Sequence, residues 1–298
     1  MEKHCGHVAL IGLPNAGKST LLNTILGTKV SIVSHKPQTT RFQVIGVHIE
    51  DQDQIIFLDT PGLFQPKSPF EKNILQAAWQ AIHECTIVAL LVDAQEGFSP
   101  RMQNAIKTLE KREIKVVVLL NKIDLIAKPK LLASAQKFYD TNIVTDIFMI
   151  SALNNDGVSD FVNYIRKKLP ATPWLYEEDQ VTNLPQRLMA SEITREKLFR
   201  TLNQELPYEL MVDTNEWEEY PDNSLKIYQT IYVKRDSQKA IVLGKAGKSI
   251  KRIGQMAREE ISELLQKKVH LFLHVKVDKL WHEKPHIFNS GHGFYSSK

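Results

Sequence analysis

The most constraining feature of this 298-residue sequence is the segment GLPNAGKST, which lies between a short apolar run and a run that favours a helix. Gly12 and Gly17 let such a loop curl so that backbone N–H groups point inward and cradle an anion. Lys18 would then reach the outer phosphates of a nucleotide, and the Ser19 hydroxyl would bind Mg²⁺ at the start of the helix. By chance this spacing arises in about one chain of this length in a hundred, so a phosphate-binding loop is favoured over an accidental glycine turn.

The length of the chain predicts about two globular domains, each large enough for its own core. The N-terminal residues lack a secretory apolar region, and no apolar run approaches the roughly 18 residues of a membrane span, so we expect a cytosolic chain without a transmembrane segment. Cys5 and Cys85 are too few for a disulfide framework or a zinc site and are expected to be reduced thiols. The formal net charge of +4 does not by itself mark a nucleic-acid binder.

Two further segments are expected near the phosphates. Residues 36–41, KPQTTR, form a polar run in which a threonine hydroxyl could complete the Mg²⁺ shell, although a solvated turn explains these residues equally well. Asp59 ends an apolar run and begins the tetrad DTPG, so its carboxylate can hold the Mg²⁺ shell while the Gly62 amide bonds the γ-phosphate. Leu63 stands where some such hydrolases have a glutamine that orients water. Hydrolysis here therefore needs another way to position its nucleophile.

Unbroken apolar runs predict a parallel β-sheet. Residues 87–92, 116–120 and 147–150 are such runs, and they alternate with helix-like segments such as residues 101–111. This alternation is typical of an α/β fold in which helices cover both faces of the sheet. Ligands of such folds bind at the carboxyl ends of the strands, so the functional groups are expected there.

The segment NKID follows one of these runs and suits a guanine base. The Asp124 carboxylate could accept hydrogen bonds from the N1–H and the exocyclic amine of guanine, a pair of donors that adenine does not offer. Asn121 would bond O6 or N7 and tie the loops together, and the Lys122 stem would lie along the base. After the next run, the backbone of Ser151 and Ala152 could meet the guanine oxygen, although the SAL triplet alone is uninformative.

These motifs, in this order over residues 12–153, resemble the Era-like branch of the translation-factor-related GTPases. GLPNAGKST together with DTPGL narrows the resemblance to this branch. It implies a P-loop GTPase domain with a mostly parallel six-stranded sheet, GTP and GDP as ligands, Mg²⁺, and K⁺ held with the help of Asn15. It also implies slow, K⁺-stimulated hydrolysis, with Mg²⁺ sensed by Thr40 or by Thr39.

The resemblance implies a role for each matching residue. The implied catalytic residues are Lys18, Thr40, Gly62 and Asn15. The implied metal ligands are Ser19, Thr40 and Asp59. The implied nucleotide contacts are Gly12, Asn15, Ala16, Gly17, Lys18, Ser19, Asp59, Gly62, Asn121, Lys122, Asp124, Ser151 and Ala152.

Prolines and a change of pattern predict the domain boundaries. The GTPase domain is expected to span residues 1–170 and to close with a helix over 158–169, before a semi-extended linker at 171–185 that is flanked by prolines. A second domain is expected over 186–280, beginning with an amphipathic helix. Residues 281–298, rich in Gly, Ser and His, are expected to form a loosely ordered tail without a metal site.

Charge is segregated within the second domain. Residues 205–222 contain seven acids and no Lys or Arg, whereas residues 234–258 contain eight bases and one acid. Among the bases lies the loop GKAG, followed by an amphipathic helix and then a strand over 270–277. A glycine loop at a helix N-terminus lets a sugar-phosphate backbone approach closely. The alternative is a small domain with an ordinary basic helix.

With its helix and strand, this loop resembles the KH RNA-binding module, in the α+β type II form that follows the GTPase domain in the Era-like branch. By propensity residues 239–243 predict a strand, but the resemblance predicts a short helix, capped by Asp236 or Ser237, and we adopt the helix. The implied RNA contacts are Gly244, Lys245, Ala246, Gly247, Lys248, Lys251 and Arg252.

The resemblance also implies partners and a cellular setting. It points to the 3′ end of 16S ribosomal RNA, to assembly of the 30S subunit, and to a cytoplasmic monomer with peripheral association at the cytoplasmic side of the inner membrane. The alternative is an RNA-binding scaffold whose nucleotide domain binds GTP or GDP with little hydrolysis. Faster hydrolysis in K⁺ than in Na⁺ would distinguish the switch enzyme from this scaffold.

Overall fold

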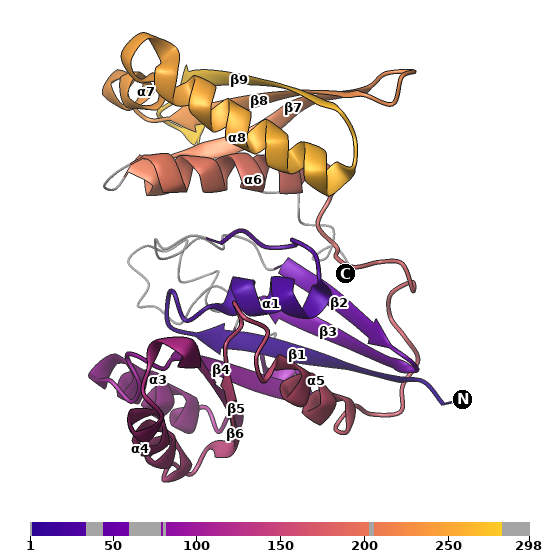
Figure 1. The fold of residues 1–298 in the computed structure, drawn as a ribbon, viewed down its shortest axis with the longest axis vertical. Coiled ribbons are helices and arrows are strands. Elements are labelled where there is room, and N and C mark those ends of the chain that lie inside the picture. The colour runs from indigo at the N-terminus through magenta and orange to yellow at the C-terminus, as the bar shows by residue number, and fades with distance from the viewer. Residues whose placement is uncertain (1, 34–43, 60–78, 80–81, 203–205, 282–298) are drawn as a thin grey trace. The chain divides into compact units, whose positions relative to one another are not determined.

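The structure is a computed structural model that describes residues 2–33, 44–59, 79, 82–202 and 206–281. The described residues form two compact units, the first ending at Asn183 and the second beginning at Leu184 (Figure 1). Each unit has its own β-sheet and its own core. The residues of the threonine run, of most of the DTPG tetrad and of nearly all the tail lie outside the described residues.

The first unit is built on a six-stranded sheet with the order β2-β3-β1-β4-β5-β6. Only β2 is antiparallel to its neighbour; the other pairs are parallel, which confirms the expected mostly parallel sheet. The strands are β1 His4–Gly12, β2 Val44–Glu50, β3 Asp53–Asp59, β4 Ile87–Asp93, β5 Val116–Asn121 and β6 Val144–Ile150.

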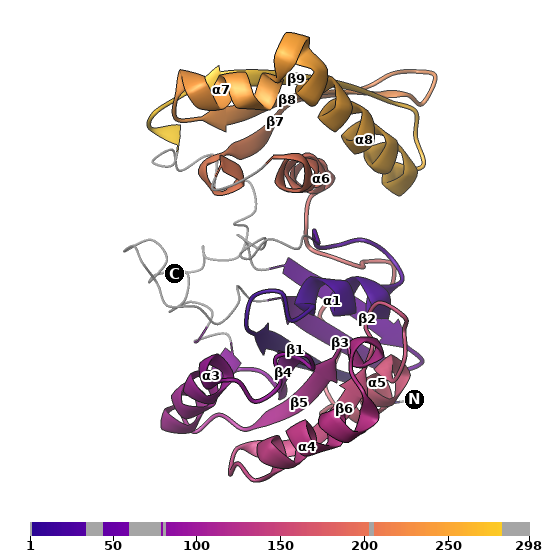
Figure 2. The same cartoon turned by 60° about the vertical axis from the view of Figure 1, so that its left-hand side comes forward.

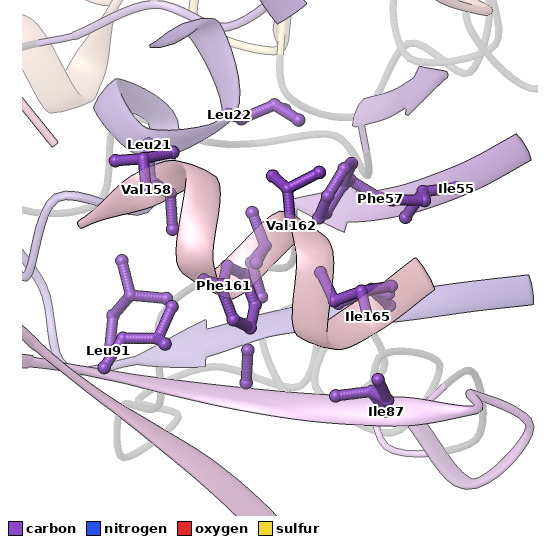
Figure 3. Packing of buried hydrophobic residues seen from close by; sticks show 14 of the residues in the cluster. Leu21, Leu22, Ile55, Phe57, Ile87, Leu91, Val158, Phe161, Val162 and Ile165 are labelled. Carbon is purple, nitrogen blue, oxygen red and sulfur yellow. The ribbon is translucent and has the colours of Figure 1, made fainter. Parts of the chain in front are cut away.

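Helices cover both faces of this sheet because its central strands are apolar throughout. The helices are α1 Lys18–Leu26, α3 Pro100–Lys111, α4 Lys128–Tyr139 and α5 Val158–Arg166. α1 and α5 pack on one face and α3 and α4 on the other (Figure 2). Figure 3 shows Leu21 of α1 and Phe161 of α5 in the first of these cores, above Leu91 of β4. The two cores fix the carboxyl ends of the strands, where the predicted site lies.

The last helix of the first unit is shorter than expected. It ends at Arg166 rather than at residue 169. The amide of Lys168 donates to the carbonyl of Ile165 over 2.8 Å, which is a tighter turn than that of an α-helix. Leu169 precedes Pro170, and the residue before a proline is disfavoured in helical conformation. The helix therefore ends one turn early.

Arg166 anchors this helix to the turn between β2 and β3. Its Nε donates to Asp53 Oδ2 over 2.7 Å, its Nη1 to Glu50 Oε1 over 2.6 Å, and its Nη2 to Asp51 Oδ2 over 2.7 Å. One guanidinium thus holds three carboxylates, a geometry that its planar fork of donors allows.

Residues 174–183, here called the strap, lie along β2 and β3. Gln54 of β3 is fully buried; its Oε1 accepts from the amides of Leu175 and Tyr176 over 2.8 and 3.1 Å. The amide of Val47 donates to the carbonyl of Val181 over 2.8 Å. Most of the segment predicted as a linker is therefore hydrogen-bonded to the first unit.

The second unit is a three-stranded sheet with the order β7-β8-β9, covered on one face by three helices. β8 is antiparallel to β7 and parallel to β9. The elements are α6 Gln186–Thr201, β7 Met211–Glu219, β8 Leu225–Val233, α7 Asp236–Leu243, α8 Lys248–Leu265 and β9 Val269–Val277. This is the expected α+β arrangement.

Residues 239–243 are helical, which confirms the family-based prediction over local propensity. The predicted cap is wrong, because the N-cap residue is Arg235 rather than Asp236 or Ser237. Gln238 provides the capping bonds: its Oε1 accepts from the amides of Lys234 and Arg235 over 2.8 and 3.1 Å. Trp281, predicted to belong to the tail, is 5% exposed and packs against Met211.

Candidate nucleotide and RNA sites

The loop between β1 and α1 is tightly enclosed. Gly17 caps α1 with a φ of 99°, and a Cβ built on it would lie 2.2 Å from Asn121 Nδ2. Only glycine therefore permits the approach of Asn121, whose Nδ2 donates to the Ala16 carbonyl over 2.8 Å. Asn15 has a φ of 65° and an exposed side chain in the same loop. The loop is shaped by a residue more than 100 positions away in the sequence.

Lys18 lies inside this loop. Its Nζ donates to the carbonyls of Gly12 and Leu13, each over 3.3 Å, and the side chain is buried. Burial lowers the pKa of Lys18, and the negative charge of Asp59 opposes that shift. The lysine thus places a cation beside the curled backbone of the loop.

Asp59 is fully buried at the end of β3. Its Oδ2 accepts from Ser19 Oγ over 3.0 Å and from Ser31 Oγ over 2.9 Å. Its Oδ1 has no hydrogen-bond partner among the described residues. Burial raises the pKa of Asp59, and the positive charge of Lys18 opposes that shift. A buried carboxylate oxygen beside a serine hydroxyl is the hard oxygen chemistry that Mg²⁺ prefers.

Ser31 is a candidate site residue that the sequence analysis missed. It is buried, and Asn23 of α1 holds its backbone: Asn23 Oδ1 accepts from the Ser31 amide over 3.0 Å, and Nδ2 donates to the Ser31 carbonyl over 2.8 Å. No motif marks a lone serine, so the sequence offered no signal for it. Thr39, Thr40, Gly62 and Leu63 lie outside the described residues.

Asn121 joins the loops at the carboxyl end of β5. Besides its bond to Ala16, its Oδ1 accepts from the Ala152 amide over 2.9 Å. Thr24 of α1 donates its hydroxyl to the Ala152 carbonyl over 2.7 Å. The structure therefore brings the phosphate loop, the NKID segment and the SAL segment to one edge of the sheet, as the parallel topology predicts.

Side chains also position the other two NKID residues. Ser151 Oγ donates to Asp124 Oδ1 over 2.6 Å, so Ser151 contributes its hydroxyl and not only the predicted backbone. Lys122 Nζ forms an ion pair of 2.6 Å with Asp93 Oδ2 at the end of β4. Nothing in the sequence marks Asp93 beyond its position directly after the apolar run 87–92. Its alignment with the end of β5 could have indicated this pairing.

In the second unit, the GKAG loop joins α7 to α8. Gly244, Ala246 and Gly247 all have positive φ values, of 70°, 52° and 73°. The predicted contacts beyond the glycines, namely Lys245, Ala246, Lys248, Lys251 and Arg252, are all exposed. α8 buries Ile253, Ala257 and Ile261 on its opposite side. The loop and the start of α8 thus offer exposed cations beside accessible backbone.

The fold and these loops define a P-loop GTPase domain followed by a KH domain. A family model described as 50S ribosome-binding GTPase matches residues 7–122, and one described as KH domain matches residues 205–282. GTPase Era of Brucella suis biovar 1 (strain 1330) is 48% identical over 284 residues, covering 95% of this chain and 91% of the relative. GTPase Era of Caulobacter vibrioides (strain NA1000 / CB15N) is 46% identical over 302 residues, which cover 97% of this chain and 96% of the relative.

Two solved structures agree with these relatives. A variant of Era from Aquifex aeolicus bound to GDP and AlF4⁻ is 38% identical, with a TM-score of 0.89, and covers 97% of this chain and 99% of that one. Era in complex with MgGDPNP and nucleotides 1506–1542 of 16S ribosomal RNA is also 38% identical, with a TM-score of 0.90 and the same coverage. The chain belongs to the Era family of GTPases.

Proposed function

We propose that this chain is a GTP-hydrolysing switch that binds the 3′ end of 16S ribosomal RNA through its KH domain and acts in assembly of the 30S subunit. The observation that supports the nucleotide half of this proposal is the pair of hydrogen bonds made by the Asn121 side chain. They fix the phosphate loop and the SAL segment at one edge of the sheet. We also propose domains at 1–170 and 186–280, joined by residues 171–185, of which the strap is held on the first unit, and a tail from 281 that begins with the packed Trp281.

The base is proposed to bind at Asp124. Its carboxylate is exposed, and the Ser151 hydroxyl holds one of its oxygens. Ser151 thus orients the Asp124 carboxylate, which can accept hydrogen bonds from the N1–H and the exocyclic amine of guanine. Asn121 bonds the base oxygen or N7, Lys122 lies along the base with its ammonium held by Asp93, and the backbone of Ser151 and Ala152 meets the guanine oxygen.

The phosphates are proposed to bind in the loop of residues 12–17. When a nucleotide binds, the Lys18 ammonium would exchange its hydrogen bonds to the carbonyls of Gly12 and Leu13 for hydrogen bonds to the outer phosphates. The negative charge of the phosphates compensates the ammonium better than two neutral carbonyls do. Ser19, Asp59 and Thr40 would hold Mg²⁺, and the unbonded Oδ1 of Asp59 fits that role. When bound, Mg²⁺ neutralises charge that develops on the phosphates.

Hydrolysis is proposed to depend on K⁺. Because Leu63 replaces a water-orienting glutamine, positive charge near the phosphates must come from elsewhere. The exposed amide oxygen of Asn15, in the phosphate loop, suits a monovalent cation, which supplies that charge when bound. We propose slow turnover in the absence of RNA, stimulated by K⁺.

A single experiment tests the switch against the scaffold. GTP turnover is measured in KCl and in NaCl at equal ionic strength, with and without RNA that spans nucleotides 1506–1542. The proposal expects faster turnover in KCl, and Asn15→Ala should remove the difference between the two salts. Equal rates in both salts would disprove the K⁺ mechanism. A chain that binds GTP but never hydrolyses it would be the scaffold instead.

The RNA half of the proposal rests on the exposed GKAG loop and on the related Era structure that contains nucleotides 1506–1542 of 16S ribosomal RNA. Gly244 and Gly247 let the RNA backbone approach, and Lys245, Ala246, Lys248, Lys251 and Arg252 line its path. We further propose that the chain acts as a cytoplasmic monomer with peripheral attachment to the inner membrane. Among the described residues, no helix is long and apolar enough to cross a membrane.

A further inference from the structure

The second unit has a sheet face that no described helix covers. Along β8 and β9 buried residues alternate with more exposed ones, and the three helices of the unit pack on the buried side. The opposite side carries Tyr228 of β8 and the exposed residues His270, Phe272, His274 and Lys276 of β9. Trp281 covers Met211 and Tyr232 at one end of this side, so the name open face is used here for the part around Tyr228 and Phe272. The GKAG loop joins two of the packed helices and so belongs to the other side of the sheet.

An aromatic stack lies at the centre of the open face. Phe272 and Tyr228 are paired in register, with ring centroids 4.6 Å apart and ring planes 16° apart. Lys226 Nζ lies 5.0 Å from the centroid of the Tyr228 ring. Phe272 remains 47% exposed. A single exposed phenylalanine is ordinary, but a stacked pair that presents one ring to solvent beside a cation resembles a platform for a planar ligand.

Charge on this side of the unit increases toward β9. Residues 267–279 contain four lysines and two histidines against one aspartate. On the β7 side, acids compensate the lysines: Glu218 pairs with Lys226 over 3.2 Å and Glu219 with Lys267 over 3.1 Å. The other lysines of this segment are Lys276 within β9, the edge strand that carries Phe272, and Lys268 and Lys279 at the two ends of that strand.

We propose that the open face is a second RNA-binding surface, separate from the GKAG loop, on which an unpaired base stacks on Phe272 and the RNA backbone follows β9 past Lys268, Lys276 and Lys279. Aromatic rings in a cationic groove bind single-stranded nucleic acid without sequence preference, since every base has a flat face to stack. The acidic β7 side excludes the backbone from the other half of the face. This chemistry favours RNA over a protein partner, for which a lone exposed ring beside a few lysines is a small anchor.

The test measures the affinity for a short fluorescent oligouridylate by anisotropy at two salt concentrations. Phe272→Leu keeps an apolar cover over Tyr228 and should still fold, but it removes the flat ring and should weaken binding about tenfold. Phe272→Tyr should retain wild-type affinity. Tyr139→Ala, which removes an aromatic residue 69% exposed on α4, is the matched control and should change nothing.

The two substitutions at this face should differ in salt dependence. Phe272→Leu removes stacking and should leave the salt slope unchanged, whereas Lys276→Gln should reduce the slope by about one. Titrations of Phe272→Leu and the wild type that overlay at both salts would overturn the proposal. So would a variant that loses binding to 30S particles while its RNA titration overlays the wild type, because the occupant would then be a protein.

Combined variants separate this surface from the GKAG site. If Lys245→Asp with Ala246→Asp weakens RNA binding and Phe272→Leu does not, the proposal for the open face is wrong and the proposal for the GKAG site stands. If the reverse holds, the GKAG site fails and the open face stands. If both surfaces bind RNA, the triple variant should show the product of the two losses, as expected for independent sites.

Discussion

The nucleotide loop and the RNA loop both contain a pair of glycines, but they use the missing side chains differently. At Gly17 the space of a Cβ is taken by the protein itself, 2.2 Å away at Asn121 Nδ2. At Gly247 no described atom lies within 4 Å of a Cβ, although φ is also positive there, at 73°. At Gly244, the other glycine of the RNA loop, a Cβ would lie 2.6 Å from the Ser249 Cβ. The first loop is thus shaped by contacts within the protein, whereas the second leaves its backbone open to a ligand at Gly247.

Burial follows the same division. Lys18, Asp59 and Asn121 are buried and already hydrogen-bonded to other elements, while Lys245 and Lys248 are exposed. A compact ligand with fixed atoms rewards groups that are positioned in advance. A polymer whose charge repeats along its length is held by exposed cations that need no single geometry. Substitutions in the nucleotide site should therefore act through geometry, and those in the RNA loop through charge.

The largest effect is expected from charge in the RNA loop. Lys245→Asp with Ala246→Asp keeps both glycines but removes a cation and adds two anions, so RNA affinity at low salt should fall by about two orders of magnitude or more. The remaining binding should have a shallower salt dependence, measured by anisotropy at several KCl concentrations. GTP affinity serves as the internal control and should not change. An unchanged RNA titration would show that residues 244–247 do not bind the RNA.

A methyl group in the nucleotide loop should have the next largest effect. Gly17→Ala adds a strained left-handed residue, about 1–2 kcal/mol, and displaces Asn121 from two buried hydrogen bonds worth about 1–3 kcal/mol each if left unmade. GTP affinity should fall at least about a hundredfold, measured by titration with a fluorescent GTP analogue.

Gly247→Ala is the matched substitution in the other loop. The alanine has the same left-handed backbone strain, but its Cβ meets no described atom, so RNA affinity should fall by only about tenfold. If both alanine variants lose their ligands equally, the difference between the two loops is not one of packing.

The next effect in size is expected from the exchange of one atom at the base site. Asp124→Asn replaces a carboxylate oxygen by an amide that cannot accept the guanine donor, which costs about 1–3 kcal/mol of GTP affinity. The variant should gain affinity for xanthosine triphosphate, measured by competition. Wild-type GTP affinity in the folded variant would exclude Asp124 as the base-reading group.

The smallest effect is expected at Ser31, whose side chain contacts the nucleotide site through Asp59 in the part of the chain that the structure describes. Ser31→Ala removes one of two donors to Asp59 Oδ2, so the Mg²⁺ concentration for half-maximal turnover should rise about two- to tenfold. GTP affinity measured without Mg²⁺ should stay the same. Ser99→Ala is the control, because it removes the cap of α3 and lowers stability by about 1 kcal/mol far from the metal ligands. A Mg²⁺ requirement equal to that of the control would contradict a role for Ser31.

Some of these features could be predicted from sequence, and the reasons differ by element. The buried strands produce unbroken apolar runs, so the parallel sheet and the edge that carries the motifs followed from the sequence, while the number of six strands followed from the family resemblance. Residues 239–243 favour a strand locally, yet Val242 is fully buried in the core between the helices and the sheet, and Gln238 caps the helix, so tertiary contacts decide the helix. The helix cap was mispredicted because the longer side chain of Gln238 makes the capping hydrogen bonds that were expected from Asp236 or Ser237.

The supporting residues of the nucleotide site were not predictable in this way. Ser31, Asp93 and Thr24 act through partners that are 28, 29 and 128 residues away in the sequence. A serine, an aspartate or a threonine alone has no pattern that marks such a contact. The motifs identify groups proposed to meet the ligand, but the groups that hold those in place emerge only from the packed structure.

The three ion pairs of Arg166 also set an order of events during synthesis. Arg166 and Asp53 are separated by 113 residues, which a ribosome adds in roughly 6 to 23 s at about 5–20 residues per second. Throughout that interval Glu50, Asp51 and Asp53 lack the charge of the Arg166 guanidinium, and the partner that Asp53 already has is His4 Nδ1, 3.0 Å from its Oδ1. The edge of the sheet at β2 gains the strap later still. The anchor between α5 and the β2–β3 turn therefore forms only after the last helix of the domain has been made.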